Sequence, residues 1–155
     1  METVYIETTM VSYLVADPSQ DILKAAKQQA TRDWWQQRDR YLCLVSQEVL
    51  DEASEGDAEQ ARRRLAALAG LQRLAITGEV RSLAEAFVAT GAMPANAARD
   101  AVHLAVATVF GADILLSWNC RHLVNRHLLR RLEVVAGREG FRLPLVCMPL
   151  ELLED

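Results

Sequence analysis

Cysteine, glycine and proline are all scarce in this sequence. Its 155 residues include only three cysteines, seven glycines and four prolines. Cys43, Cys120 and Cys147 form an odd set without a CxxC pair, which excludes a disulfide scaffold and fits a reducing compartment. With 51% hydrophobic and 25% charged residues, the composition also excludes a disordered or collagen-like chain.

Long hydrophobic runs and an excess of positive charge are missing as well. No apolar run reaches the roughly 18 residues of a membrane helix, and the N-terminal METVYIETTM does not resemble a signal peptide. We therefore expect a cytoplasmic protein without membrane association. The net charge of −4 argues against a passive nucleic-acid binder, but not against an enzyme that meets nucleic acid through a small site.

A chain of this length suits one domain, and nothing in the sequence marks a boundary within residues 1–155. Short apolar runs alternate with segments of helical periodicity, and they are too apolar to have an exposed face. This pattern predicts an α/β fold: a single-domain three-layer α/β/α sandwich around a central parallel sheet of about five strands. The expected strands are Val4–Ile6, Tyr41–Val45, Leu74–Ile76, Ile114–Ser117 and Leu145–Cys147.

Capping residues and glycines predict where the helices begin and end. The expected helices run from a cap at Ser19 to about Arg38, from a capping box of Asp57 and Gln60 through Ala69, from Thr77 to near Gly91, from beyond Pro94 to Phe110, and from His127 to about Glu139.

Polar residues follow two of the expected strands. In parallel sheets the functional crevice lies beyond the carboxyl ends of the strands. Glu7 directly follows the first strand, and Asn119 comes just after the fourth. Taken alone, Glu7 is as consistent with a solvated acid beside a helix as with a site residue. Asp113 lies at the opposite end of the fourth strand, so we exclude it from the site.

An acidic helical segment, SQEVLDEASEG, follows the second strand. Its predicted buried stripe is Val49, Leu50 and Ala53, and Glu52 is the acid closest to that stripe. Like charges four residues apart, such as Glu48 and Glu52, destabilise the helix mildly, and a cation near Glu52 would offset this effect. By itself, the segment fits a solvated helix face better than a site.

Asp100 is the sharpest single indication of a site. It stands near the start of AARDAVHLAVATVF, which is apolar on almost every side, and shares one helical row with His103. A buried ionised acid costs free energy unless it is hydrogen-bonded, paired or metal-bound. A structural, hydrogen-bonded aspartate remains the alternative, and His103 fits a packed histidine better than a catalytic one.

Together these acids predict a metal site, since all three would converge on one crevice. Two unit charges 4 Å apart repel by about 4 kcal/mol at an effective dielectric of 20, so either one acid takes up a proton or a hard cation binds. Oxygen ligands of this type suit Mg²⁺ or Mn²⁺. The expected chemistry is metal-assisted phosphodiester hydrolysis.

Three segments, YIETTMVSYL, LVSQEVLDEASEGD and DAVHLAVATVFGADILLSWNCRHL, resemble PIN-domain proteins of the VapC toxin type. The resemblance covers nearly the whole chain, in order. It implies a PIN fold, a Mg²⁺- or Mn²⁺-dependent ribonuclease acting on RNA, and a toxin of a toxin–antitoxin pair. It also implies a homodimer that a small cognate antitoxin inhibits.

The resemblance also implies the roles of individual residues. The family's three acids fall on Glu7, where the family more often has Asp, and on Glu52 and Asp100. The last acidic position falls on Asn119, which keeps an oxygen ligand but removes a charge, so that a second metal would bind more weakly. Supporting roles are expected for Thr8, Thr9 and Ser117 around the ligands, and for Arg121 and His122 at the RNA phosphate.

The departures at Glu7 and Asn119 leave an alternative open: a catalytically weak or inactive PIN-like protein that acts as a protein- or RNA-binding module. A zinc site from Cys120, His122 and His127 lacks a fourth ligand. In the pair Trp34–Trp35, we expect one ring in the core and the other as an interface anchor for a second copy or an antitoxin.

Overall fold

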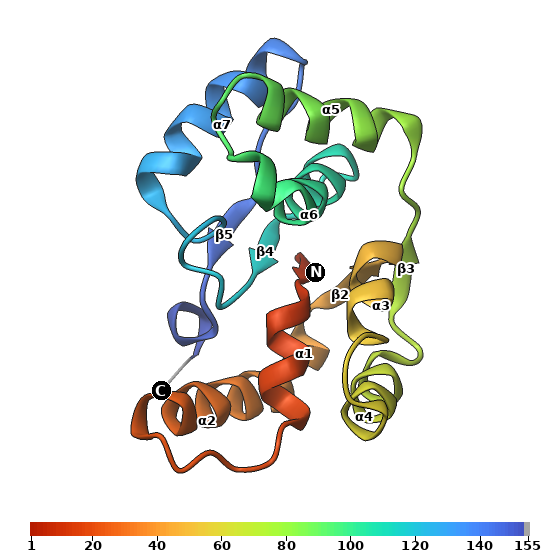
Figure 1. Ribbon diagram of the computed structural model, residues 1–155, viewed down its shortest axis with the longest axis vertical. Helices are drawn as coiled ribbons and strands as arrows, with labels where there is room; N and C mark the ends of the chain where they lie inside the picture. The colour runs from red at the N-terminus through yellow and green to blue at the C-terminus, as the bar shows by residue number, and fades with distance from the viewer. Residues whose placement is uncertain (154–155) are drawn as a thin grey trace.

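Five short strands form an entirely parallel sheet in the order β3–β2–β1–β4–β5 (Figure 1). The computed structural model describes residues 1–153. The strands are β1 (Thr3–Ile6), β2 (Leu42–Ser46), β3 (Gln72–Leu74), β4 (Ile114–Leu116) and β5 (Leu145–Cys147). The chain starts at the centre of the sheet, moves outward to β3, and then crosses back to add β4 on the other side of β1. The predicted five-stranded parallel sheet is confirmed.

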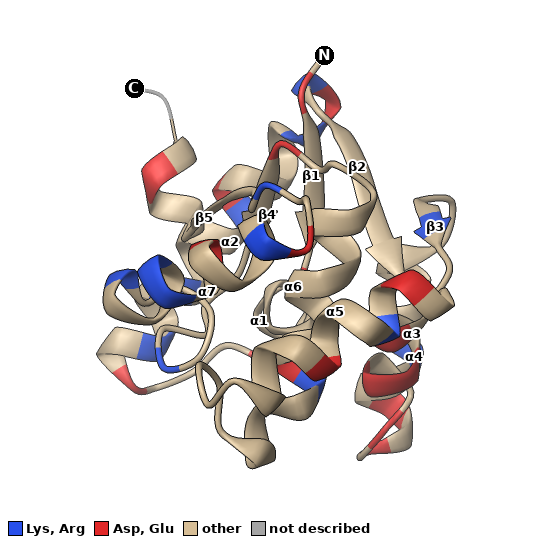
Figure 2. Cartoon of the chain, turned by 90° about the horizontal axis from the view of Figure 1, so that it is seen from above, with Lys and Arg blue, Asp and Glu red and all other residues tan. Residues whose placement is uncertain are grey.

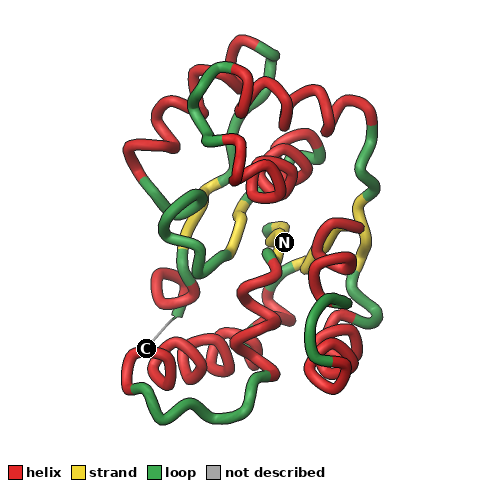
Figure 3. The backbone as a smooth tube through the Cα atoms, viewed as in Figure 1, coloured by secondary structure: helices red, strands yellow, loops and turns green. Residues whose placement is uncertain are grey.

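Helices cover both faces of this sheet. Figure 1 shows α5, α6 and α7 on one side and α1, α2 and α4 on the other, and Figure 3 shows the loops that join these elements. Within residues 1–153 no helix combines the length and the apolar character that crossing a membrane requires. The helices are α1 (Thr8–Val15), α2 (Ile22–Gln36), α3 (Gln47–Ala53), α4 (Ala58–Leu68), α5 (Gly78–Ala89), α6 (Ala98–Val109) and α7 (Arg126–Arg138), with 3-10 turns at Arg38–Arg40, Ala95–Ala97 and Pro149–Leu152.

Two helix starts differ from the sequence-based expectation. We did not predict α1, which begins directly after β1 because the Glu7 carboxylate caps it by accepting a hydrogen bond from Thr9 N at 3.0 Å. Asp21, not Ser19, caps α2, since its carboxylate accepts from Lys24 N at 3.0 Å. Ser19 instead accepts a hydrogen bond from Asp21 N, one step before the helix. The third strand also lies earlier than expected, at Gln72–Leu74.

The core lies on both sides of the central strands. Val4, Tyr5 and Ile6 of β1 are completely buried, which explains why this strand has no polar face. Helix α6 is apolar on almost every side because it is buried from Ala101 through Ala107 except at Val102. Trp34 is buried in the core, whereas Trp35 is partly exposed and its ring centre lies 4.7 Å from the Arg38 guanidinium.

Candidate metal site

The carboxyl ends of β1, β2 and β4 meet at one edge of the sheet. The connection from β1 leads towards β2, whereas β4 is reached only after the crossover, so the strand order reverses between β1 and β4. Such switch points are where open α/β sheets bind ligands. A polar residue stands at each of the three ends: Glu7 after β1, Ser46 at the end of β2 and Ser117 after β4.

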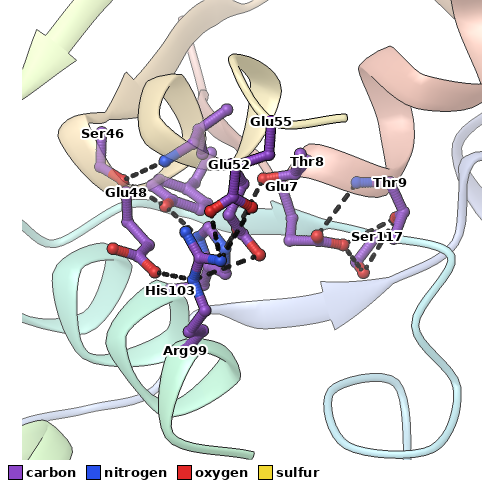
Figure 4. A network of polar contacts seen from close by, with 12 residues as sticks. Glu7, Thr8, Thr9, Ser46, Glu48, Glu52, Glu55, Arg99, His103 and Ser117 are labelled. Atoms are coloured by element: carbon purple, nitrogen blue, oxygen red, sulfur yellow. Dashed lines mark hydrogen bonds and ion pairs between the residues drawn. The ribbon is translucent and has the colours of Figure 1, made fainter. Parts of the chain in front are cut away.

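Glu7 is held across this switch point. Its side chain is almost completely buried, at 3% exposed. Its Oε1 accepts hydrogen bonds from Thr9 Oγ1 at 2.7 Å and from Ser117 Oγ, and its Oε2 accepts from Thr9 N (Figure 4). The backbone donor belongs to the first turn of α1, where the helix dipole favours negative charge. The orientation of the Glu7 carboxylate is therefore fixed by α1 and by Ser117, which follows the neighbouring strand β4.

Glu52 approaches the same place from α3. Its Oε1 accepts a hydrogen bond from Thr8 Oγ1 at 2.8 Å and contacts His103 Nε2, whereas its Oε2 lies 3.8 Å from Arg99 Nε. Burial disfavours the charge on Glu52. Hydrogen bonds from His103 and Thr8 and the positive charges of His103 and Arg99 nevertheless hold the pKa of Glu52 below its ordinary value.

His103 connects Glu52 to the core. The imidazole is completely buried, and its Nδ1 lies 2.7 Å from the Tyr5 hydroxyl, which lies 2.7 Å from Ser46 Oγ. Burial opposes protonation of the ring, but the hydrogen bond to Glu52 and the charges of Glu7 and Glu52 raise the pKa of His103. Burial also raises the pKa of Tyr5, so this hydroxyl keeps its proton.

Arg99 is the cation that the acidic segment requires. Its Nε lies 2.7 Å from Glu48 and its Nη1 lies 2.8 Å from Glu55, so one guanidinium of α6 bridges acidic residues on and just beyond α3 (Figure 4). These partners raise the pKa of Arg99. Glu48, which lies further than Glu52 from the predicted buried stripe of this segment, is also partly buried in the structure.

The residues that come closest together are not quite the predicted set. Within residues 1–153, the group of acidic and imidazole ligand atoms that lie within 4.8 Å of one another comprises Glu7, Glu52 and His103. Asp100 belongs to the first turn of α6, one turn before His103, and lies outside this group. The carboxylate oxygens of Glu7 and Glu52 suit a hard divalent cation, so the residues present fit a metal, whereas both ring nitrogens of His103 already contact protein groups.

Asp100 and Asn119 lie beside this group. Burial raises the pKa of Asp100, although the positive charge of His103 and a hydrogen bond from Asn119 partly offset that effect. Asn119 Oδ1 accepts from His122 N at 3.0 Å, and Asn119 N donates to Ser117 Oγ at 2.9 Å. The loop after β4 is therefore hydrogen-bonded to Ser117, which in turn donates a hydrogen bond to Glu7.

Sequence reasoning missed two functional candidates, Tyr5 and Arg99, and interpreted His103 as a packed histidine. The three-residue spacing of Asp100 and His103 on one helical face was a usable signal for His103. No sequence signal indicated Tyr5, because the sequence of an apolar strand does not show which residue a tyrosine hydroxyl contacts. Arg121 is exposed and His122 partly buried in the loop after β4, in the positions expected for residues at the rim of the site.

Comparison with known proteins supports the fold through one similar structure. No known family matches the sequence, and no curated protein matches it. Among solved structures, a chain of the crystal structure of VapBC2 from Rickettsia felis bound to a DNA fragment from their promoter has a similar fold, with a TM-score of 0.55. The match covers 94% of this chain and 98% of that chain at 13% sequence identity. The chain therefore has a single α/β domain with a PIN-like fold.

Proposed function

We propose that this protein is a Mg²⁺- or Mn²⁺-dependent endoribonuclease of the VapC type, a hydrolase that cleaves phosphodiester bonds. The observation that carries the proposal is the convergence of Glu7 and Glu52, from separate elements, at the switch point of a PIN-like sheet. Buried carboxylates that face one another need a cation or a proton to offset their repulsion.

Glu7, Glu52 and Asp100 would hold the ion, with Asn119 as a neutral oxygen ligand. When bound, the metal supplies a polarised water nucleophile and stabilises the leaving oxygen. Thr9 and Ser117 orient the Glu7 carboxylate through their hydroxyl groups, and Thr8 orients Glu52. Arg121 and His122 contact the RNA phosphates from the loop after β4.

We further propose that the protein is a toxin of a VapBC-type pair in the cytoplasm, with a small cognate antitoxin as partner and a homodimer as its assembled state. The similarity in fold to a chain of VapBC2 supports the toxin–antitoxin assignment. Measurement of the size in solution tests the homodimer, since a species of 17.3 kDa alone contradicts it.

The test of the nuclease is cleavage of structured RNA by the purified protein with Mn²⁺. We expect Asp100→Asn to lose at least about 100-fold in rate, because it removes a ligand charge from the site. Glu85→Gln, which neutralises an exposed acid of α5, is the matched control and should cleave like the wild type. Equal cleavage by wild type and Asp100→Asn would point to a contaminating nuclease.

The inactive binding module is the second candidate. It is favoured by one observation, that Asn119 Oδ1 is already engaged by His122 N. The two functions differ in metal binding: a ligand that binds the folded state raises thermal stability in proportion to the logarithm of its concentration. A melting temperature that stays constant up to millimolar Mn²⁺ would favour the module over the nuclease.

A further inference from the structure

We infer that His103 is a positioning residue that orients Glu52 for the bound ion, as the last member of a buried hydrogen-bond chain from Ser46 through Tyr5. The inference rests on the proposed function, and adds a residue outside the ligand set of Glu7, Glu52, Asp100 and Asn119. Its basis is a series of contacts: Ser46 Oγ with Tyr5 OH, Tyr5 OH with His103 Nδ1, and His103 Nε2 with Glu52 Oε1. Figure 4 shows Ser46, His103 and Glu52 of this series.

The direction of this chain follows from the number of protons available. Ser46 Oγ accepts a hydrogen bond from Val49 N at 3.4 Å, so its own proton is free to be donated to the Tyr5 oxygen. A hydroxyl has one proton to donate, and Tyr5 then donates its proton to His103 Nδ1. A neutral imidazole that accepts at Nδ1 carries its proton at Nε2. That proton points at Glu52 Oε1.

The opposite direction is disfavoured. If Nδ1 of a neutral ring donated to Tyr5, the bare lone pair of Nε2 would face a carboxylate oxygen with no proton between them. Because the His103 ring is completely buried, two facing acceptors destabilise the site more than they would in water. A charged imidazolium has protons on both nitrogens and again donates from Nε2. His103 therefore donates to Glu52 whether the ring is neutral or charged.

The consequence is a fixed orientation of the Glu52 carboxylate. Thr8 Oγ1 and His103 Nε2 both donate to Oε1, which leaves Oε2 on the side of Arg99, 3.8 Å from its Nε. The chain also joins three elements, because Tyr5 lies on β1, Ser46 on β2 and His103 on α6. Partners that orient a metal ligand in this way are usually worth about 10- to 100-fold in metal affinity.

The first test is made on the metal-free wild type, and a variant is needed only to assign the signal. Nitrogen-15 NMR of the imidazole side chains reports which ring nitrogen carries a proton. We expect the buried ring of His103, assigned by its disappearance in His103→Gln, to be protonated at Nε2. A deprotonated Nε2 overturns the inference.

The second test measures Mn²⁺ affinity. We expect His103→Ala to bind Mn²⁺ about 10- to 100-fold more weakly, and Tyr5→Phe to show a smaller loss in the same direction. His103→Gln should recover most of the affinity, because its amide N–H can take the place of the Nε2 donor. His127→Gln, at an exposed histidine of α7, is the control and should bind like the wild type.

The outcomes separate this inference from the proposed function. If the wild type binds no Mn²⁺, the proposed function fails. If the wild type binds Mn²⁺ and folded His103→Ala binds it equally well, only the role of His103 fails. Nitrogen coupling from His103 in the pulsed EPR spectrum of the bound Mn²⁺ would make His103 a ligand and overturn the positioning role. Should His103→Ala fail to fold, His103→Gln and Tyr5→Phe decide.

Discussion

The partly buried carboxylate of Asp100 destabilises the metal-free protein, and a bound cation would offset this effect. At the scale of single residues, its carboxyl group is partly buried, and this burial raises its pKa. A charge taken out of water destabilises the folded chain unless partners compensate for it. Asp100→Asn keeps the shape of the side chain and removes the charge. We therefore expect the metal-free variant to have a higher melting temperature than the wild type at pH 7, although it no longer cleaves RNA.

Thermal melts of both proteins in a chelator, and again with Mn²⁺, check this prediction. The metal should raise the melting temperature of the wild type more than that of Asp100→Asn, because only the wild type keeps the ligand charge. A variant that melts below the wild type in chelator would instead identify Asp100 as a structural, hydrogen-bonded aspartate, the alternative that its sequence context leaves open.

The predictability of the site differs from residue to residue. Glu7 and Glu52 were accessible from sequence, because one follows an apolar strand and the other borders a buried helical stripe. The structure places them within 4.8 Å of a common partner, His103. The spacing of Asp100 and His103 indicated only that these two residues share one helical face. The contact of His103 with the Tyr5 hydroxyl was not accessible, since the two residues are 98 positions apart in the sequence. Which side chains meet inside a core is decided by packing, and the spacing of residues along the chain does not contain that information.

At the scale of elements, one side chain joins the beginnings of two central strands. Asp113 precedes β4, and its Oδ2 accepts hydrogen bonds from Thr3 N at 2.8 Å and from Thr3 Oγ1 at 3.1 Å, at the start of β1. Thr3 Oγ1 in turn lies 2.9 Å from Asp113 N and accepts its hydrogen bond. This contact lies at the end of the sheet opposite to the acidic site, in agreement with the exclusion of Asp113 from that site.

The Asp113 contact predicts a pH-dependent stability. Hydrogen bonds from the backbone and side chain of Thr3 lower the pKa of Asp113. A carboxyl whose pKa is lowered on folding stabilises the protein above its unfolded pKa of about 3.9, and this contribution is lost as the pH falls through the folded pKa. Asp113→Asn should therefore melt below the wild type at pH 7, with a difference that shrinks as the pH falls below about 4.

Melting temperatures of the two proteins at a series of pH values from 7 to 3 measure this difference. Glu85→Gln, which replaces an exposed acid of α5, serves as the control substitution and should melt like the wild type. A difference between Asp113→Asn and the wild type that stays constant over the whole series would show that the charge of Asp113 contributes nothing to the contact.

The fold of the whole molecule was predictable to a greater extent than its helix boundaries. Apolar strands alternating with helices restrict the chain to a covered parallel sheet, whatever the details of the loops. The start of α1 was missed because its cap, Glu7, is not one of the usual capping residues. The same carboxylate caps α1 and belongs to the candidate metal site. A candidate site residue therefore occupies a helix-capping position that local sequence preferences do not favour.

Charge is distributed unevenly over the molecule as a whole. The net charge is −4, and Figure 2 shows basic residues along α7 and acidic ones on α3. A net negative protein does not attract RNA over long distances, so the RNA binding that we propose would depend on a few local phosphate contacts. The exposed Arg121, in the loop between β4 and α7, is well placed to make one of them.

The salt dependence of RNA binding tests this contact. For single-stranded RNA, each phosphate contact contributes about −0.7 to the slope of log affinity against log salt concentration. We expect Arg121→Ala to weaken binding and to make that slope less steep by about 0.7, with little effect on thermal stability. Arg62→Ala, at an exposed residue of α4 paired with Glu59, is the matched control and should leave the slope unchanged. If Arg121→Ala keeps the wild-type slope, Arg121 does not contact an RNA phosphate, and the proposed contact at this residue is wrong.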